Sequence, residues 1–396
     1  MNIALTKNLL TILFLLILSI LHIACSSETG EPLSEKRILN TACEIYLPLA
    51  QKLSPEDGYP RSIIDGKTWK LVPASDWTSG FFPGILWQLY HFSQDSALFI
   101  QAKRWTNDLK DQTTAPTHDV GFMINNSFGK GYRIKSLADF KTTTVEAAYH
   151  LATRFNPRIG ALRSWDWGEF KFPVIIDNMM NLELLYWAAN MNGDSTLTLI
   201  ANTHAKTTIR DHIRDDGSTF HVVDYNPETG KVFWKGTHQG LADSSTWARG
   251  QAWGIYGFTV AFRETNEPLF LDTACRLANW FIQHLPEDGI PYWDFDAPDK
   301  AEEPKDASAA AIAASGLWEL SMLIDEEALS ERYRETSKKM TKTLLSEKYS
   351  AKQAGIPALL LHSTGSRPEN NEVDVPLIYA EYYFIEALIR QLSKSS

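Results

Sequence analysis

Apolar side chains recur with a helical period along most of the chain, and this pattern limits the folds that the chain can adopt. Stretches rich in Leu, Ala and aromatic residues alternate with short segments of Gly, Pro and Asp, which interrupt helices. The eleven expected helices are 37–53, 80–93, 97–111, 145–155, 178–192, 195–213, 245–264, 269–285, 308–324, 329–347 and 375–392. Helices that follow one another in pairs exclude doubly wound sheets and β-sandwiches.

Two all-helical architectures fit such a series: an open solenoid and a closed toroid of helical hairpins. The sequence shows no repeat of fixed period, which counts against a solenoid. We therefore predict an all-α toroid that forms one domain over residues 35–396, with a cavity lined by loops and helix N-termini. Only 218–233 is typical of a β-hairpin, because the turn residues Asn226, Pro227 and Gly230 separate two apolar arms.

Residues 1–24 are typical of a secretory signal, because a single lysine precedes a long apolar run. Ala24-Cys25 resembles a bacterial lipoprotein site, although His22 stands where such sites usually carry Leu. Residues 25–34 are polar and would form a tether. We predict an exported lipoprotein, periplasmic or attached to the outer membrane, whose only membrane contact is a lipid on Cys25. An uncleaved anchor and plain secretion are the alternatives.

Composition excludes several partners and cofactors. The formal net charge is -10 and no cluster of Lys and Arg is present, so we expect no nucleic-acid partner. Besides Cys25, only Cys43 and Cys275 carry thiols, which is too few for a disulfide framework or a clustered zinc site. The histidines lack the spacing of metal ligands, and no nucleotide-binding or zinc-protease motif occurs. We expect neither a metal nor another cofactor.

Tryptophan is the residue type that best indicates a ligand class. The chain has 13 tryptophans, and several stand in polar, turn-rich segments, such as Trp77 in SDWTSG and Trp165 in LRSWDW. An indole suits the C–H face of a sugar ring, and neighbouring polar side chains suit its hydroxyl groups. The set therefore indicates a carbohydrate ligand, although packing in the interior is the simpler interpretation for any single tryptophan.

Two aspartates at helix-leading positions, Asp119 and Asp177, are candidates for acid chemistry. Asp177 follows the apolar run 174–176 and begins a helix. It either caps that helix or is a carboxyl group partly removed from water, whose raised pKa lets it donate a proton; both interpretations remain open. Arg249 and Trp253 share one helix face, which suits a carboxylate and a sugar ring or forms a structural cation–π contact.

Six motifs resemble, in the expected order, those of the unsaturated glucuronyl hydrolases. They are SDWTSGFFPG, HDVGFM, ALRSW, IIDNMMNL, THQGLADSSTWARGQAWGIYGF and HSTG. The resemblance covers nearly all of the chain after the signal, and it implies an (α/α)₆ toroid of six helical hairpins. Relatives that act on unsaturated rhamnogalacturonan usually carry Asn-Gly where this chain has Gln251-Ala252. The resemblance is therefore closer to the branch that acts on glycosaminoglycans.

The resemblance implies hydrolysis of oligosaccharides made by polysaccharide lyases, whose non-reducing end carries a uronic acid with a C4=C5 double bond. Protonation of C4 of this vinyl ether leaves an oxocarbenium-like centre at C5. Water adds there, and the resulting hemiketal opens and releases the remaining sugar. By this resemblance Asp177 is the general acid and then the base, and Asp119 is a second essential carboxylate.

The resemblance also implies binding roles for three tryptophans, which match positions that stack on sugar rings, and for four polar residues around the unsaturated uronate. They are Trp77, Trp165 and Trp253, and His221, Gln239, Arg249 and His362. The chemistry of a guanidinium makes Arg249 the expected partner of the uronate carboxylate. Ser363, Ser366 and Arg367 lie where family members differ in their tolerance of sulfate, so sulfate binding and an ordinary polar loop are both open.

Three other functions are compatible with the sequence. The first is an unsaturated rhamnogalacturonyl hydrolase, which uses the same hydration chemistry on pectin fragments. The second is an ordinary inverting glycosidase in which Asp119 and Asp177 divide the acid and base roles. The third is a surface lipoprotein that binds glycans through its tryptophans without turnover, and it would not need a buried acid.

Overall fold

The structure is a computed structural model that describes residues 34–298, 302–352 and 354–393. The predicted signal, 1–24, and nearly all of the predicted tether, 25–34, lie outside the described residues. Helices make up most of the described chain, as the periodicity predicts, and the strands are short. Across these ranges, no helix has both the length and the hydropathy that crossing a membrane requires.

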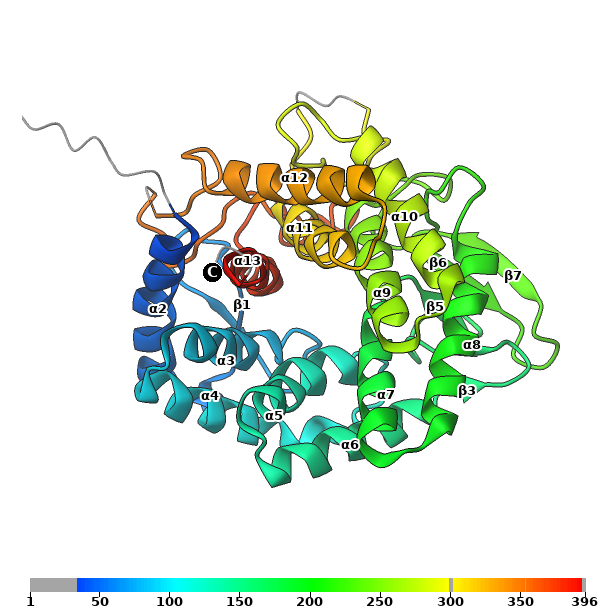
Figure 1. Ribbon diagram of the computed structural model, residues 1–396, viewed down its shortest axis with the longest axis horizontal. Helices are drawn as coiled ribbons and strands as arrows, with labels where there is room; N and C mark the ends of the chain where they lie inside the picture. Colours follow the sequence, from blue (N-terminus) through cyan, green and yellow to red (C-terminus); the bar gives the residue numbers. More distant parts are fainter. Residues whose placement is uncertain (1–33, 299–301, 353, 394–396) are drawn as a thin grey trace, which may run out of the picture.

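Six segments form a closed inner ring in which each segment packs against the next (Figure 1). They are α3 (Phe81–Ser93), the π-helix η3 (Gly121–Gly129), α7 (Asn178–Asn192), α9 (Ala248–Thr265), α11 (Ala307–Ser321) and α13 (Ile378–Leu392). The ring closes because α13 also packs against α3. Nearly every residue of α9 and α11 is buried, as expected for helices that are covered on all sides.

Six outer helices cover this ring from outside (Figure 1). They are α2 (Glu35–Lys52), α4 (Ser96–Asp108), α6 (Ala138–Ala152), α8 (Ser195–His212), α10 (Pro268–Gln283) and α12 (Glu327–Leu344). Each outer helix buries one face only. In α10, for example, Phe270, Thr273, Ala274, Leu277 and Ala278 are buried, which is the spacing of a single helical stripe.

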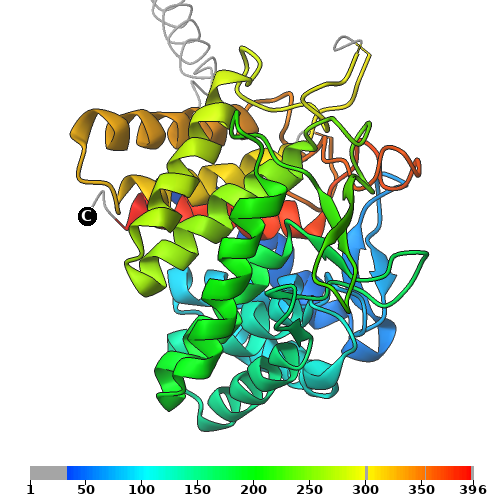
Figure 2. The same cartoon turned by 90° about the vertical axis from the view of Figure 1, so that its right-hand side faces the viewer.

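The remaining elements are short and connect the long helices along the chain, and Figure 2 shows the strands on one side of the helices. They are η1 (Pro55–Asp57), η2 (Leu109–Thr114), α5 (Lys130–Lys135), β1 (Tyr59–Ser62), β2 (Lys70–Val72), β3 (Phe155–Asn156), β4 (Ala161–Leu162), β5 (Pro173–Ile175), β6 (Val222–Tyr225) and β7 (Val232–Gly236). The predicted hairpin is confirmed as β6 and β7. The expectation of a single hairpin was wrong, because β5 pairs with β6, and two further antiparallel pairs form.

The segment from η3 to α5 is helical, whereas the sequence favours a loop there. Its glycines and asparagines are typical of turns, but Gly121 has a packing role. A Cβ atom on Gly121 would lie 2.3 Å from Oδ1 of Asn181, so only glycine lets η3 approach α7 this closely. The amide of Phe122 donates to that same Oδ1. Tertiary packing therefore overrides local propensity and completes the inner ring.

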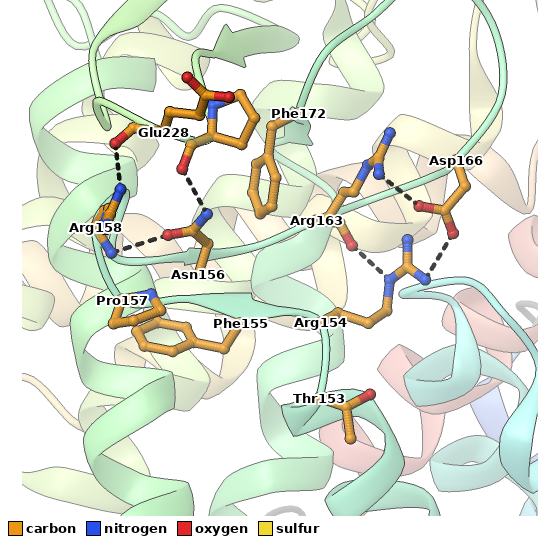
Figure 3. A pocket seen from close by; sticks show the side chains of 11 residues that line it. Thr153, Arg154, Phe155, Asn156, Pro157, Arg158, Arg163, Asp166, Phe172 and Glu228 are labelled. Atoms are coloured by element: carbon orange, nitrogen blue, oxygen red, sulfur yellow. Dashed lines mark hydrogen bonds and ion pairs between the residues drawn. The ribbon is translucent and has the colours of Figure 1, made fainter.

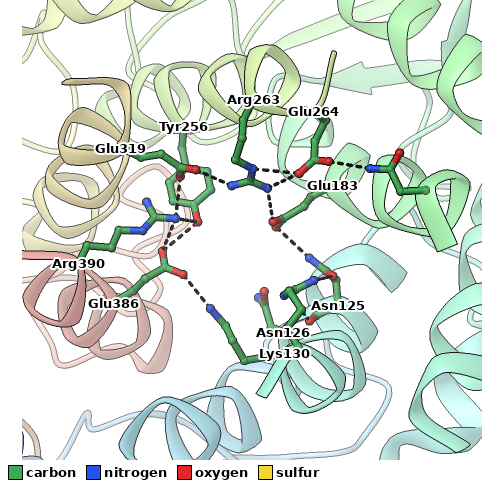
Figure 4. Close-up of polar contacts among 12 residues, drawn as sticks. Asn125, Asn126, Lys130, Glu183, Tyr256, Arg263, Glu264, Glu319, Glu386 and Arg390 are labelled. Carbon is green, nitrogen blue, oxygen red and sulfur yellow. Dashed lines mark hydrogen bonds and ion pairs between the residues drawn. The ribbon is translucent and has the colours of Figure 1, made fainter. Parts of the chain in front are cut away.

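A network of charged side chains joins the inner helices away from their N-termini (Figure 4). Arg263 of α9 pairs with Glu183 of α7 and Glu319 of α11. Arg390 of α13 pairs with Glu319 and Glu386, and Glu386 also accepts from Lys130 at the start of α5. Burial raises the pKa of Glu386, but the charges of Arg390 and Lys130 outweigh it, so that pKa falls well below its usual range.

We expect Glu386→Gln to lower the free energy of unfolding by about 3 kcal/mol, because it leaves the half-buried cations of Lys130 and Arg390 without their shared, buried carboxylate. Urea unfolding of the purified protein measures this loss. Glu335→Gln is the matched control, since Glu335 pairs with Lys338 on the surface and should contribute less than about 0.5 kcal/mol. Equal losses in the two variants would contradict a stabilising role for the network.

Candidate active site

A cavity of about 250 Å³ lies where η3, α7 and α9 begin. Its lining includes both candidate acids, Asp119 and Asp177, together with Arg249. Trp77, Trp165, Gln239 and Ser366, which the sequence also proposes, line the same cavity. The structure thus brings together residues that are far apart in the sequence. Within the described ranges, no group of His, Cys, Asp or Glu side chains could hold a metal ion.

Asp177 occupies the N-cap position of α7 but does not cap the helix. Its backbone is already helical, with φ of -56°, and its side chain makes no capping hydrogen bond. The carboxyl is only 13% exposed, and its Oδ1 has no hydrogen-bond partner among the described residues. Burial raises the pKa of Asp177 to about 7; the charge of Arg249 opposes this rise and the charge of Asp119 adds to it. The capping interpretation was therefore wrong.

His221 presents a ring N–H toward Asp177. Its Nδ1 accepts hydrogen bonds from the backbone amides of His238 and Gln239, each at 3.2 Å. Because an amide only donates, Nδ1 carries the lone pair and the proton lies on Nε2. Nε2 is 3.7 Å from Oδ1 of Asp177. Burial keeps the pKa of His221 well below its usual value, so the ring is neutral and its N–H faces the carboxyl group.

Arg249, near the start of α9, is fixed beside the cavity by three acceptors. One guanidinium nitrogen lies 3.1 Å from a carboxylate oxygen of Asp306 and also donates to the carbonyl of Thr364; the other donates to the carbonyl of Gly365 at 2.7 Å. The guanidinium lies over the rings of Trp247 and Tyr379, and not over Trp253 as its position on the helix predicts. This places a rigid cation beside Asp177.

Asp119 is held just before η3. The hydroxyl of Thr117 donates to its carboxylate at 3.0 Å, and Nε2 of His118 lies 3.3 Å away. The other ring nitrogen of His118 is 2.7 Å from the side-chain oxygen of Asn178, the first residue of α7. His118 therefore links Asp119 to the helix that carries Asp177.

Four predicted binding residues do not line the cavity: His221, which lies behind it beside Asp177, and Trp253, Ser363 and His362. Trp253 is fully buried between the rings of Phe122 and Tyr383, so it offers no face to a sugar, although its indole N–H helps to lower the pKa of Asp177. The backbone of Ser363 pairs with that of Val375, and its buried hydroxyl has no partner in the described part of the chain.

His362 lines a neighbouring hollow instead, where its Nδ1 lies 2.6 Å from Asp374. The segment from Ser363 to Val375 folds back on itself, because Ser363 pairs with Val375 and Ser366 pairs with Asn371. His362 and Arg367 point away from the catalytic cavity, whereas Ser366 points into it. The structure therefore places His362 outside the cavity that holds Asp177, and its contact with the uronate stays a prediction.

Comparison with known proteins identifies the family. No family model matches the chain. An unsaturated glucuronyl hydrolase from Formosa agariphila is 41% identical over an alignment of 399 positions that covers 97% of this chain and 98% of that protein. This chain belongs to the unsaturated glucuronyl hydrolase family. An unsaturated chondroitin disaccharide hydrolase from Streptococcus agalactiae is 33% identical over 84% of this chain and 85% of that protein.

A solved structure supports the same assignment. The crystal structure of an unsaturated glucuronyl hydrolase specific for heparin matches with a TM-score of 0.87 and 42% identity, over 91% of this chain and 97% of that chain. The chain is therefore a glycosidase of the unsaturated glucuronyl hydrolase family, and the resemblance found in its sequence motifs is confirmed.

Sequence reasoning missed several residues of this unsaturated glucuronyl hydrolase site. Trp167, His238, Trp247 and Tyr379 all line the cavity. Trp167 was detectable, because it stands two residues after Trp165 and side chains at this spacing share a face of extended backbone. Tyr379 lies inside a helix whose pattern indicates only burial, so no local signal marks it.

The burial of Asp177 predicts a pH-dependent cost in stability. A free aspartate has a pKa of about 3.9, and burial raises that of Asp177 to about 7. The carboxyl is protonated in both states below about pH 4, so it costs nothing there; between about pH 4 and 7 only the unfolded chain readily loses the proton, so the cost grows over that range and levels off above pH 7. Asp177→Asn should therefore match the wild type near pH 4 and be more stable by about 2–4 kcal/mol near pH 8.

Urea unfolding at the two pH values measures this difference. Asp194→Asn is the control, because Asp194 caps α8, is exposed, and has a pKa lowered by its hydrogen bonds to Thr196 and Tyr149. Loss of that carboxylate should bring no gain at pH 8. If Asp177→Asn gains nothing there either, Asp177 is not held in a neutralising environment.

Proposed function

We propose that this protein removes the 4,5-unsaturated glucuronic acid from the non-reducing end of glycosaminoglycan oligosaccharides, by hydrating the C4=C5 double bond. The observation that carries this proposal is a buried carboxyl group, Asp177, whose pKa of about 7 leaves it partly protonated at neutral pH. A group with that pKa can give a proton and then take one back within a single cycle.

In the proposed reaction, Asp177 acts first as the acid and then as the base. Asp177 gives its proton to C4, and the electron pair of the double bond forms the new C–H bond, which leaves positive charge on C5 and the ring oxygen. The carboxylate of Asp177 then takes a proton from a water molecule as that water adds to C5. The hemiketal opens by breaking the bond between C5 and the ring oxygen, and the hemiacetal left at C1 releases the remaining sugar.

Neighbouring side chains suit the charges of this reaction. Arg249 carries a fixed positive charge beside the cavity, which suits the uronate carboxylate. The N–H of His221 faces Asp177 and stabilises the carboxylate that forms after proton transfer. Burial is the main cause of the raised pKa of Asp177, and the charge of Asp119 adds to it, which supports the role of Asp119 as the second essential carboxylate.

The choice of glycosaminoglycan rests on the relatives named above and on the motifs, since one relative acts on chondroitin disaccharides and another on heparin. The side chain of Gln251, which replaces the Asn of the pectin-type motif, donates to the carbonyls of Gly217 and Leu277. Its effect on substrate choice is therefore indirect. The hydroxyl of Ser366 lies at the cavity without a partner among the described residues, so it suits a hydroxyl or sulfate oxygen of the leaving sugar.

The decisive experiment uses unsaturated disaccharides made by lyases from chondroitin, hyaluronan and heparin. Turnover is followed as loss of the ultraviolet absorbance of the conjugated double bond. We expect turnover by the wild type and a fall of about 10³-fold or more in Asp177→Asn, because the proton donor is gone. Asp194→Asn, at the N-cap of another helix, should keep full activity.

Three outcomes would contradict the proposal. Turnover of a saturated glucuronide would indicate an ordinary inverting glycosidase. Activity only on unsaturated rhamnogalacturonan would move the substrate to pectin. No turnover of any of these sugars, combined with tight binding, would favour a glycan-binding protein.

We also propose that the closed ring of helices is an (α/α)₆ toroid, in which η3 takes the place of one inner helix. The contacts of η3 with both α3 and α7 support this arrangement. A crystal structure in which η3 did not lie between those helices would contradict it.

For localisation, we propose export as a lipoprotein with its acyl chain on Cys25, on the basis of the apolar run before Ala24-Cys25. In cells supplied with labelled fatty acid, the wild type should carry label in the membrane fraction, and Cys25→Ser should not. Equal labelling of both would exclude Cys25 as the acylated residue.

A further inference from the structure

A pair of stacked tryptophans forms part of the cavity rim. The rings of Trp165 and Trp167 lie 4.7 Å apart with an interplanar angle of 12°. Trp165 is buried, whereas Trp167 is 55% exposed, and both line the cavity that holds Asp177. Trp167 is therefore the outer member of the pair and presents its free face to solvent.

The residue between these tryptophans, Asp166, is held by two arginines (Figure 3). Asp166 lines a separate open hollow of about 620 Å³, where its carboxylate lies 2.9 Å from a guanidinium nitrogen of Arg154 and 3.1 Å from one of Arg163. Arg154 also donates to the carbonyl of Arg163 at 2.8 Å. The Arg154 side chain is only 9% exposed, whereas that of Asp166 is 44% exposed, so the cation is the shielded member of this ion pair.

Aromatic contacts hold the same loop from the cavity side. The ring of His238 packs against both indoles, at 5.9 Å from Trp165 and 5.5 Å from Trp167. Phe170 packs edge-on against Trp165 at 5.5 Å. An exposed indole on a loop would ordinarily move between rotamers, but these contacts hold Trp167 in one position before any ligand arrives.

The size of the cavity indicates what this indole contacts. At about 250 Å³, the cavity falls below the roughly 300–1,000 Å³ of most small-molecule sites, so it suits the terminal uronate and little more. The rest of an oligosaccharide must then extend across the rim. Trp165 lies deeper and Trp167 further out, so successive rings of one chain would meet them in that order. The exposed Phe233, by contrast, does not line the cavity.

We propose that Trp167 is a stacking platform for the third sugar ring of the substrate, counted from the unsaturated uronate, and that Asp166 is a positioning residue that holds it there through Arg154 and Arg163. The inference rests on the proposed function, because it takes the unsaturated uronate to bind beside Asp177. It makes the protein selective for chain length, with tetrasaccharides preferred to disaccharides.

The test compares kcat/KM on unsaturated disaccharides and tetrasaccharides of one glycosaminoglycan. We expect Trp167→Ala to lower kcat/KM on the tetrasaccharide by about 3- to 10-fold, through KM, and to lower it less on the disaccharide. Trp167→Phe should recover most of the loss. Phe233→Ala, which removes an equally exposed aromatic ring elsewhere, should change neither value.

The outcomes separate this inference from the proposed function. If the wild type turns over neither substrate, the proposed function fails. If the wild type is active and Trp167→Ala loses nothing on the tetrasaccharide, or loses equally on both substrates, the platform is refuted while the proposed function stands.

Asp166→Asn tests the positioning role, because it keeps the size of the side chain and removes the charge that the two arginines hold. We expect the circular-dichroism signal of the coupled indoles to weaken, and KM for the tetrasaccharide to rise with kcat unchanged. A lower melting temperature with an unchanged indole signal and unchanged KM would show that Asp166 only stabilises the fold, and would overturn this part of the proposal.

Discussion

The packing of α13 against α3 closes the inner ring, and the active site depends on this closure. Asp119, Asp177 and Arg249 come from three different parts of the ring, each placed at or near the start of its segment. These residues are far apart along the chain, so contacts between chain neighbours do not bring them together. Because the helices are packed side by side around a closed circuit, fixing the axes of the helices also fixes where their first residues meet. The geometry of the site is thus a property of the whole ring.

Within that frame, the behaviour of Asp177 reflects a competition between opposing effects. The helix N-terminus and the charge of Arg249 favour the ionised carboxylate, whereas burial and the charge of Asp119 favour the neutral acid. Burial is the largest of these effects, and the pKa rises to about 7. The lack of a capping hydrogen bond contributes to this result, because such a bond would have stabilised the carboxylate. Asp177 is therefore suited to acid and base chemistry because its buried carboxyl group lacks the hydrogen bonds that would stabilise its charge.

The sequence predicts the long helices well, since their periodicity records which face is buried; the expected helix 178–192 has the same bounds as α7. It fails for η3, where Gly121 is explained by a close approach to Asn181 that no local pattern reveals. In the site, the acids and most of the polar residues were found from their context and motifs. The sequence does not show how a residue faces, so Trp253 and His362 were assigned to the cavity although one lies buried and the other points away.

The way in which Arg249 is held has a consequence for how this family can diversify. Two of its three anchors are backbone carbonyls, those of Thr364 and Gly365, in the same segment that presents Ser366 to the cavity. A carbonyl oxygen is present whatever side chain the residue carries. Substitutions in this segment can therefore change which substituted sugars are accepted, while the hydrogen bonds from Arg249 to the backbone carbonyls remain. Selectivity can thus change during evolution while Asp177 and Arg249 keep their positions.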